Sequence, residues 1–424
     1  MKKRILLALV VGALLLGLLG NVFAAKKAQK VTLLTSQAKY RDVYKTIAAK
    51  IKADENITIE FQVVPDDQYY NLLKVKLATK EVPDIFMHNA PQQYTVVNAA
   101  RNCVDLSKEP WVGRLVNPKL LKAADGKIYA MPQESSSAFM VCYYNKKVFA
   151  DLGLSEPATY AEFLDLLEKI KNSGKGITPI YMSNKDTWTT QIFMTAGFPV
   201  AMAGKDPKVW DKLIANKLKF ADVPEFNQVL SSYNDLYKKG LVNPDHLSAT
   251  YDMAKEAVAT GKAAMMYNGE WAATDIYDKY HTELGSFVVP IGDKQIMATG
   301  SFVQGFFIPK ASKNAALAKK VLNLWSQPKY MNLYYAEKPG FPGFKDVDGG
   351  KVLPCVANLV NKYISTGKYV YEMNSYVEIA GPILPELWSY YVEMVAGGKT
   401  PKQVLQAWDA KFADFMKSKQ QPGW

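Results

Sequence analysis

Residues 257–271 read AVATGKAAMMYNGEW and carry three structural signals in succession. The first residues keep the apolar spacing of a helix, and Gly261 suits the left-handed position after a last helical turn. The apolar run at 263–267 has the length of a buried strand. In open α/β sheets, ligands bind beyond the carboxyl ends of strands, so residues 268–271 would offer polar groups and a large ring there. The stretch predicts an α/β fold with a binding platform, although composition alone would also allow Trp271 in a core.

The N-terminal segment predicts export. Three basic residues at positions 2–4 precede an apolar run at 5–19, which is short for a membrane span, and small residues follow it. This pattern is typical of a secretory signal peptide over residues 1–24, cleaved after Ala24. No cysteine lies near that position. We therefore expect a periplasmic or extracellular protein without a lipid anchor.

Charge and cysteine content narrow the function classes. The formal net charge is +12, and loss of the three basic residues in the signal segment lowers it to +9. Lysine and arginine are scattered among acidic residues, which argues against a nucleic-acid partner. The three cysteines, Cys103, Cys142 and Cys355, allow either a bridge between the first two or buried thiols. Dispersed histidines and the absence of cysteine pairs at metal spacing predict no metal and no cofactor.

The mature chain is longer than one ordinary core, which predicts two domains. Its beginning has the pattern of a βαβ unit, with a strand at 31–35, a helix through 44–51 and a strand at 57–64. A helix at 69–78 and a buried strand at 83–89 follow. The first part is therefore expected to be a wound α/β lobe.

The middle and the end of the chain are richer in helix signals. Residues 127–149 hold two short apolar strands around a polar segment at 133–137, the pattern of a crossing between lobes. A capping box formed by Thr159 and Glu162 begins a helix that ends near Lys171. The other expected elements are strands at 177–183 and within 285–310, and helices at 187–197, 207–216, 224–239 and 315–325.

Common catalytic motifs are missing from the sequence. It contains no G-x-S-x-G elbow, no H-E-x-x-H pair and no Walker-type phosphate loop. Glu134 and Glu270 could form the acid pair of a glycosidase, but carboxylates also serve as acceptors for sugar hydroxyls. We predict that the protein is not an enzyme.

Several motifs, in order along the chain, carry a family resemblance. They are EVPDIFMHN (81–89), DGKIYAMP (125–132), YYNKKVFADLGL (143–154), PATYAEFLDLLEKIK (157–171), ATGKAAMMYNGEWAATDI (259–276) and AALAKKVLNLWS (315–326). Over its mature length the chain resembles the extracellular solute-binding proteins of ABC importers. Within these it is similar to the carbohydrate-binding family that includes maltose-binding protein.

The resemblance implies a periplasmic-binding-protein fold of type II, with two α/β lobes, hinge crossovers and a ligand cleft between the lobes. Lobe 1 would comprise residues 25–133 and 291–345, and lobe 2 residues 134–290 and 346–424. The protein would capture a sugar or oligosaccharide by lobe closure and deliver it to the membrane permease of an ABC importer. It would act as a monomer.

The resemblance also implies ligand residues. Trp271 falls at the stacking tryptophan of the family, while Trp188 and Trp388 are further candidate rings that core packing would also explain. The polar candidates are Gln37, His88, Asn89, Glu134, Glu270, Ser301 and Gln304. Two alternatives stay open at this point: the same fold binding a polyamine, a phosphoester or an iron complex, and a secreted glycosidase.

Overall fold

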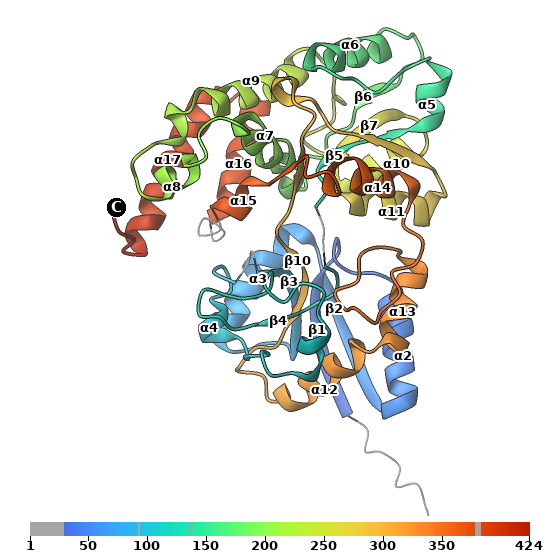
Figure 1. The fold of residues 1–424 in the computed structure, drawn as a ribbon, viewed down its shortest axis with the longest axis vertical. Coiled ribbons are helices and arrows are strands. Elements are labelled where there is room, and N and C mark those ends of the chain that lie inside the picture. Colours follow the sequence, from blue (N-terminus) through green and yellow to red (C-terminus); the bar gives the residue numbers. More distant parts are fainter. Residues whose placement is uncertain (1–28, 92–93, 136–137, 378–382) are drawn as a thin grey trace, which may run out of the picture.

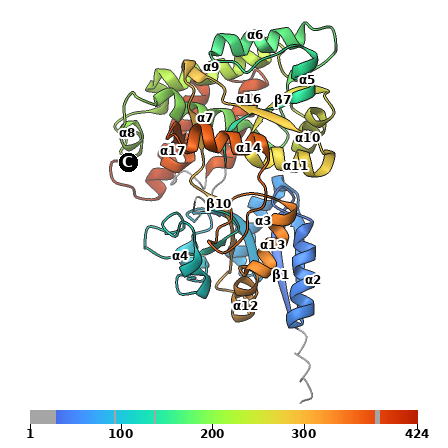
Figure 2. The ribbon, with the colours of Figure 1, turned by 45° about the vertical axis from the view of Figure 1, so that its right-hand side comes forward.

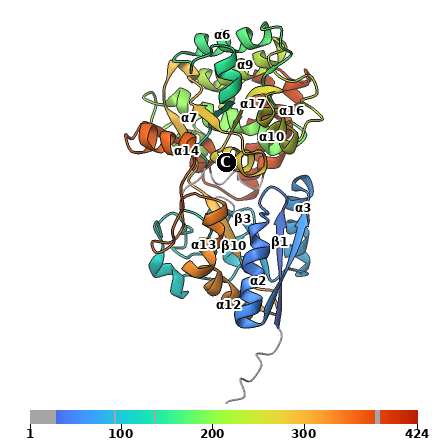
Figure 3. The same ribbon diagram turned by 90° about the vertical axis from the view of Figure 1, so that its right-hand side faces the viewer.

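The computed structural model describes residues 29–91, 94–135, 138–377 and 383–424. The expected signal peptide at 1–24 lies outside the described residues. Two lobes stand one above the other, and the same two-part outline is visible from the side (Figures 1, 2 and 3). This arrangement confirms the expected two-lobe α/β fold. No described helix combines the length and the apolar character needed to span a membrane.

Lobe 1, the lower lobe in Figure 1, is built on a five-stranded sheet in the order β2-β1-β3-β10-β4. Its strands are β1 (Gln29–Ser36), β2 (Ile57–Val64), β3 (Ile85–Ala90), β4 (Ala130–Pro132) and β10 (Val303–Phe307). Strands β2 and β3 run parallel to β1, and β10 is antiparallel to β3 and β4. Its helices are α2 (Val43–Glu55), α3 (Asp66–Thr79), α4 (Ala99–Asn102), η1 (Pro110–Arg114), α12 (Ala315–Trp325) and α13 (Pro328–Glu337).

The predicted βαβ unit is confirmed, and β2 has the expected bounds. Helix α2 buries Tyr44, Ile47 and Ile51 at a spacing of three to four residues, which places one apolar stripe against the sheet. The helix ends at Asn56, whose left-handed conformation lets the chain turn into β2. Trp325 is 1% exposed in the same core, as its position on an apolar helix stripe suggests.

Lobe 2 contains a four-stranded sheet in the order β6-β7-β5-β8 and a two-stranded sheet β11-β9. Its strands are β5 (Val141–Asn145), β6 (Thr178–Ile180), β7 (Ala263–Asn268), β8 (Leu284–Phe287), β9 (Met297–Thr299) and β11 (Tyr369–Tyr371). Its first helices are α5 (Lys146–Asp151), α6 (Tyr160–Lys171), η2 (Thr187–Gln191), α7 (Ile192–Met202), α8 (Val209–Ile214), η3 (Phe220–Asp222) and α9 (Pro224–Lys238). The later ones are α10 (Tyr251–Ala259), α11 (Glu270–Tyr280), η4 (Ile291–Asp293), α14 (Pro354–Leu359), η5 (Val360–Ile364), α15 (Met373–Tyr376), α16 (Leu384–Val395) and α17 (Pro401–Ser418).

Local signals in lobe 2 agree in part with the sequence prediction: Thr159 caps α6 and Gly261 is left-handed, but the capping box expected between Thr159 and Glu162 is not completed. The Thr159 hydroxyl caps α6 by accepting the Glu162 N–H, while the Glu162 carboxylate accepts the N–H of Ala158 instead of that of Thr159. Gly261 is left-handed, with φ of 76°, between α10 and the fully buried strand β7. The helix expected at 187–197 divides into η2 and α7.

The chain crosses between the lobes after β4, before β10 and after α13 (Figure 1). Two expected bounds differ from the structure: residues 291–299 lie with lobe 2, and Asp346 and Val347 contact lobe 1, where Asp346 pairs with Arg114 and Val347 joins the core. Ile291 and Ala298 belong to the core of lobe 2, and β9 pairs with β11 there. The other lobe bounds stay a prediction. The three cysteines are buried and free in the described structure.

Candidate ligand-binding cleft

A cavity with a volume of about 190 Å³ lies between the two lobes. Lobe 1 lines it with residues that follow β1, with Asn89 near the end of β3, with the first turns of α3 and with the end of α13. Lobe 2 lines it with the start of α11 and with residues of η2 and α16. The predicted ligand residues that line the cleft are Asn89, Glu134, Trp188, Glu270, Trp271, Gln304 and Trp388.

Trp271 forms an aromatic wall with Trp188 on the lobe 2 side. The centroids of the two rings are 6.3 Å apart, and the Trp188 ring also lies 5.2 Å from that of Tyr251. Trp271 lies three residues after the end of β7, and its ring folds back over Gly269, where a Cβ would be only 2.2 Å from the ring. The absence of a Cβ at Gly269 therefore leaves room for the Trp271 ring in this position.

A second aromatic contact spans the two lobes. Trp388 on α16 is 4% exposed, and its ring centroid lies 5.9 Å from that of Tyr70 on α3 in an edge-to-face arrangement. The indole Nε1 atoms of Trp188 and Trp388 are buried without a hydrogen-bond partner among the described residues. Such donors are costly to bury unless a ligand or water accepts from them.

Glu134 and Gln304 occupy the floor of the cleft at the lobe crossings. The Glu134 carboxylate accepts the Gln304 backbone N–H at 3.0 Å. Burial raises the pKa of Glu134 above its ordinary value, although that hydrogen bond and Lys39 oppose the rise. The Gln304 side-chain oxygen is buried and has no partner in the described structure. This oxygen is an acceptor available to a hydroxyl group.

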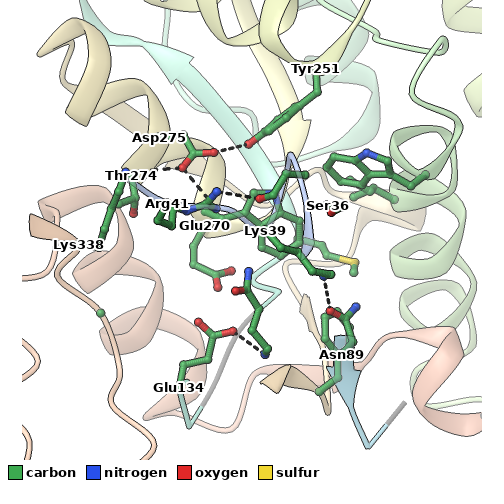
Figure 4. A pocket seen from close by; sticks show the side chains of 18 of the residues that line it. Ser36, Lys39, Arg41, Asn89, Glu134, Tyr251, Glu270, Thr274, Asp275 and Lys338 are labelled. Atoms are coloured by element: carbon green, nitrogen blue, oxygen red, sulfur yellow. Dashed lines mark hydrogen bonds and ion pairs between the residues drawn. The ribbon is translucent and has the colours of Figure 1, made fainter. Parts of the chain in front are cut away.

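Glu270 begins α11 and is tied to the first crossing segment. Its two carboxylate oxygens accept the N–H groups of Ala138 at 3.1 Å and Phe139 at 2.7 Å. Burial raises the pKa of Glu270 to about 7; the Phe139 bond opposes this rise and the charge of Glu134 adds to it. The carboxylates of Glu134 and Glu270 face one another across the pocket (Figure 4). Each carboxylate is held by hydrogen bonds from backbone N–H groups.

Lys39 and Asn89 lie at the ends of neighbouring strands in lobe 1. The Lys39 ammonium donates to the Asn89 side-chain oxygen at 2.6 Å (Figure 4). Burial lowers the pKa of Lys39 to about 8, although Asp66 and Glu134 raise it. Because β1 and β3 are parallel and adjacent, their carboxyl ends bring the two side chains together.

Asp275 on α11 forms ion pairs across the cleft. Its carboxylate lies 3.5 Å from the Arg41 guanidinium and 3.9 Å from the Lys338 ammonium, both from lobe 1. The Tyr251 hydroxyl donates to Asp275 at 3.3 Å (Figure 4). Lys338 also pairs with Asp278. These contacts join the two lobes at one side of the cleft.

The family model that describes bacterial extracellular solute-binding proteins matches residues 37–332, more than half of the chain. The chain belongs to this family. This solute-binding protein is 24% identical over 260 residues to the melibiose/raffinose/stachyose-binding protein MelE of Bacillus subtilis, a match that covers 59% of the chain and 58% of MelE. It is 26% identical over 338 residues to the multiple sugar-binding protein of Streptococcus mutans, covering 77% of the chain and 76% of that relative.

A solved structure supports the fold of this solute-binding protein. A chitin oligosaccharide binding protein superposes with a TM-score of 0.75 at 22% identity, covering 91% of this chain and 98% of that one. This likeness shows the two-lobe fold and does not by itself identify a ligand. The chain matches 58% of the length of MelE, little more than half of that relative.

Three predicted ligand residues of the solute-binding protein lie away from the cleft. His88 is 1% exposed behind Tyr70, with ring centroids 5.3 Å apart, and burial lowers its pKa well below the ordinary value. Gln37 is exposed and lines an outer groove between the lobes. Ser301 is half-buried, and its N–H donates to the Ser375 hydroxyl. Strand ends and crossings place these residues near the cleft, but alternate residues turn away from it.

Other cleft residues were not predicted from the sequence. They are Lys39, Arg41, Tyr70, Tyr251, Asp275 and Lys338. A usable signal existed for Lys39 and Arg41, which closely follow the first strand of the predicted βαβ unit. Tyr70 and Asp275 sit within helices, where amphipathic spacing does not distinguish a cleft-facing residue from a solvent-facing one.

Proposed function

We propose that this protein is the substrate-binding component of an ABC importer for sugars. A sugar or oligosaccharide would enter the cleft, hold the lobes together and be delivered to the membrane permease. The observation that carries the proposal is the combination of an aromatic wall with buried, unpartnered hydrogen-bonding atoms in one cavity. Pyranose rings have an apolar face that stacks on indole, and their hydroxyl groups both donate and accept.

The hydrogen-bonding atoms of the cleft match a polyol. Trp188 and Trp388 supply indole donors, and the side-chain oxygens of Gln304 and Asn374 supply acceptors. A sugar hydroxyl group can accept a hydrogen bond from an indole N–H and donate one to a side-chain amide oxygen. Filling these positions would remove the cost of burying unpaired polar atoms and would favour the closed, loaded state.

The charges in the cleft favour a neutral solute over the charged alternatives. The described lining residues include three cations, Lys39, Arg41 and Lys338, and four carboxylates, Asp66, Glu134, Glu270 and Asp275. Arg41 and Lys338 pair with carboxylates, so neither sign dominates the space. A polyamine receptor would need an excess of acidic groups, and a phosphoester receptor would need available arginines.

The names of relatives agree with a sugar ligand. MelE is named for melibiose, raffinose and stachyose, and the Streptococcus mutans relative for multiple sugars. The structural neighbour is named for chitin oligosaccharides. We propose only the class of ligand, a sugar, for this chain, and no particular one of these sugars. Membership of an extracellular family also supports export by the expected signal peptide.

We further propose that the cleft binds without catalysis. Both oxygens of Glu270 accept backbone N–H groups, and Glu134 accepts the Gln304 N–H. These bonds suit fixed acceptors, whereas a glycosidase needs one carboxyl to give its proton to the glycosidic oxygen. Chromatography of a bound oligosaccharide before and after long incubation tests this point, since a receptor returns the oligosaccharide unchanged.

A thermal-shift screen of residues 25–424 tests the ligand class. The panel contains mono- and oligosaccharides, with a polyamine, a phosphate ester and a ferric chelate as controls. A ligand that binds only the folded state raises the melting temperature. Shifts confined to saccharides are expected. A shift with a control class alone would keep the fold and refute the sugar assignment.

A further inference from the structure

We propose that Asp275 is a positioning residue for ligand capture, acting as an ionic latch that holds lobe 1 and lobe 2 together over the bound solute. The latch consists of Asp275 and Asp278 from α11 and of Arg41 and Lys338 from lobe 1. This inference rests on the proposed function, because it concerns how the closed cleft retains its ligand.

The geometry of the latch places one carboxylate among cations of both lobes. Asp275 meets Arg41 at 3.5 Å and Lys338 at 3.9 Å from lobe 1, and Lys255 at 3.6 Å from its own lobe. Arg41 is held in place because its guanidinium donates to the carbonyls of Ala38 at 2.7 Å and Tyr40 at 2.9 Å. The cation is therefore oriented by lobe 1 before the lobes meet.

Burial makes these pairs stronger than ordinary surface pairs. The side chains of Asp275, Arg41 and Lys338 are 10%, 12% and 16% exposed. Charges in such a position are screened less by water and salt than fully exposed ones. The second bridge, between Lys338 and Asp278, lies on the same helix face one turn further along α11. Two bridges from adjacent turns resist a separation of the lobes at this edge.

The latch stands where the cleft would open. Arg41, Asp275 and Lys338 line the enclosed cleft and also an outer groove between the lobes. They therefore form the wall between the ligand space and the solvent-exposed groove. A lobe rotation that joins the two spaces, and so admits or releases a solute on this side, has to separate Asp275 from its lobe 1 partners.

Loss of the Asp275 charge should shift the lobe equilibrium toward the open state. Arg41, Lys338 and Lys255 would then face one another with less compensation, and like charges on opposite lobes repel. A ligand that binds only the closed state would bind more weakly, by the same factor by which the population of the closed state falls. From the coupling of close charge pairs we expect a loss of affinity of about tenfold or more, mainly as faster release.

The test compares Asp275→Asn with Asp252→Asn. Asp252 pairs with Lys255 at 2.8 Å within lobe 2 and is 81% exposed, so its substitution removes a nearby charge that does not join the lobes. Release rates for the strongest saccharide of the screen are measured at low and high salt. We expect faster release for Asp275→Asn only, together with a weaker salt dependence than in the natural protein. Equal release rates for all three proteins would overturn the latch.

A second variant and a ligand-free measurement test the latch independently of Asp275→Asn. Lys338→Gln removes charge from lobe 1 and should also speed release, even if Asp275→Asn fails to fold. The double variant should lose less binding free energy than the two single variants added together, because both substitutions remove the Asp275–Lys338 pair. Small-angle scattering without ligand should show a more open shape for either variant than for the natural protein. An unchanged shape refutes the latch, whereas absence of saccharide binding to the natural protein refutes the proposed function alone.

Discussion

The Glu270 carboxylate accepts the backbone N–H of Phe139 at 2.7 Å. Its other oxygen accepts the N–H of Ala138, so both of its oxygens bind the crossing segment between β4 and β5. Glu270 begins α11, and the next residue is Trp271 of the aromatic wall. The contact therefore ties the start of α11, which carries Trp271, to a segment that joins the lobes.

Glu270 should make the stability of the protein depend on pH in a defined window. The pKa of Glu270 is raised from 4.5 to about 7 in the folded protein, mainly by burial. The folded state then holds the proton more tightly than the unfolded one. This contribution to the free energy of unfolding is complete below about pH 4.5 and is lost as the pH rises through about 7.

Urea unfolding of the natural protein and of Glu270→Gln at several pH values measures this contribution. The difference in the free energy of unfolding should fall by about 1 to 3 kcal/mol over that window. Glu60→Gln serves as control, since that side chain is 48% exposed on β2, and should follow the natural protein. Parallel curves for Glu270→Gln and the natural protein would contradict the prediction.

Removal of the Trp271 ring should weaken saccharide binding. Trp271→Ala loses the apolar face on which a pyranose would stack, worth about 2 kcal/mol or about thirtyfold in Kd. Trp424→Ala is the matched control, because that ring packs near Phe412 at the C-terminus, away from the cleft. Isothermal titration calorimetry with the best saccharide gives both affinities. Equal affinities would remove Trp271 from the site.

A methyl group at position 269 should displace the Trp271 ring. In Gly269→Ala the new Cβ would lie 2.2 to 2.6 Å from three ring atoms, so the ring has to move away from its wall with Trp188. We expect a loss of affinity of about tenfold, corresponding to about 1.4 kcal/mol. Gly113→Ala, which meets no atom within 4 Å, should bind normally. Normal binding by Gly269→Ala would show that ring position matters little.

Local signals in the sequence predicted the elements of the fold well. Strand β2, the Thr159 cap and the left-handed Gly261 depend on neighbouring residues only, and each has the expected form. The prediction of one helix at 187–197 was less accurate, because the first turn of this segment forms the 3-10 helix η2 beside the cleft. Short-range propensity does not determine how a terminal turn packs.

Site residues were predictable where they follow strand ends. Trp271, Asn89 and Glu134 lie in the cleft because strand ends and crossings meet there. The pair of Arg41 and Asp275 joins residues more than two hundred positions apart on different lobes. No local pattern specifies such a pair, because it depends on how the finished lobes face one another.

A crystal structure of residues 25–424 grown with the strongest saccharide of the screen tests the central claim most directly. We predict a pyranose ring stacked on Trp271 and Trp188, with hydroxyl groups bonded to the side-chain oxygen of Gln304 and to an indole nitrogen. Asp275 should remain paired with Arg41 across the closed cleft. A saccharide bound elsewhere, or a cleft that stays empty while the saccharide binds in solution, would contradict the account.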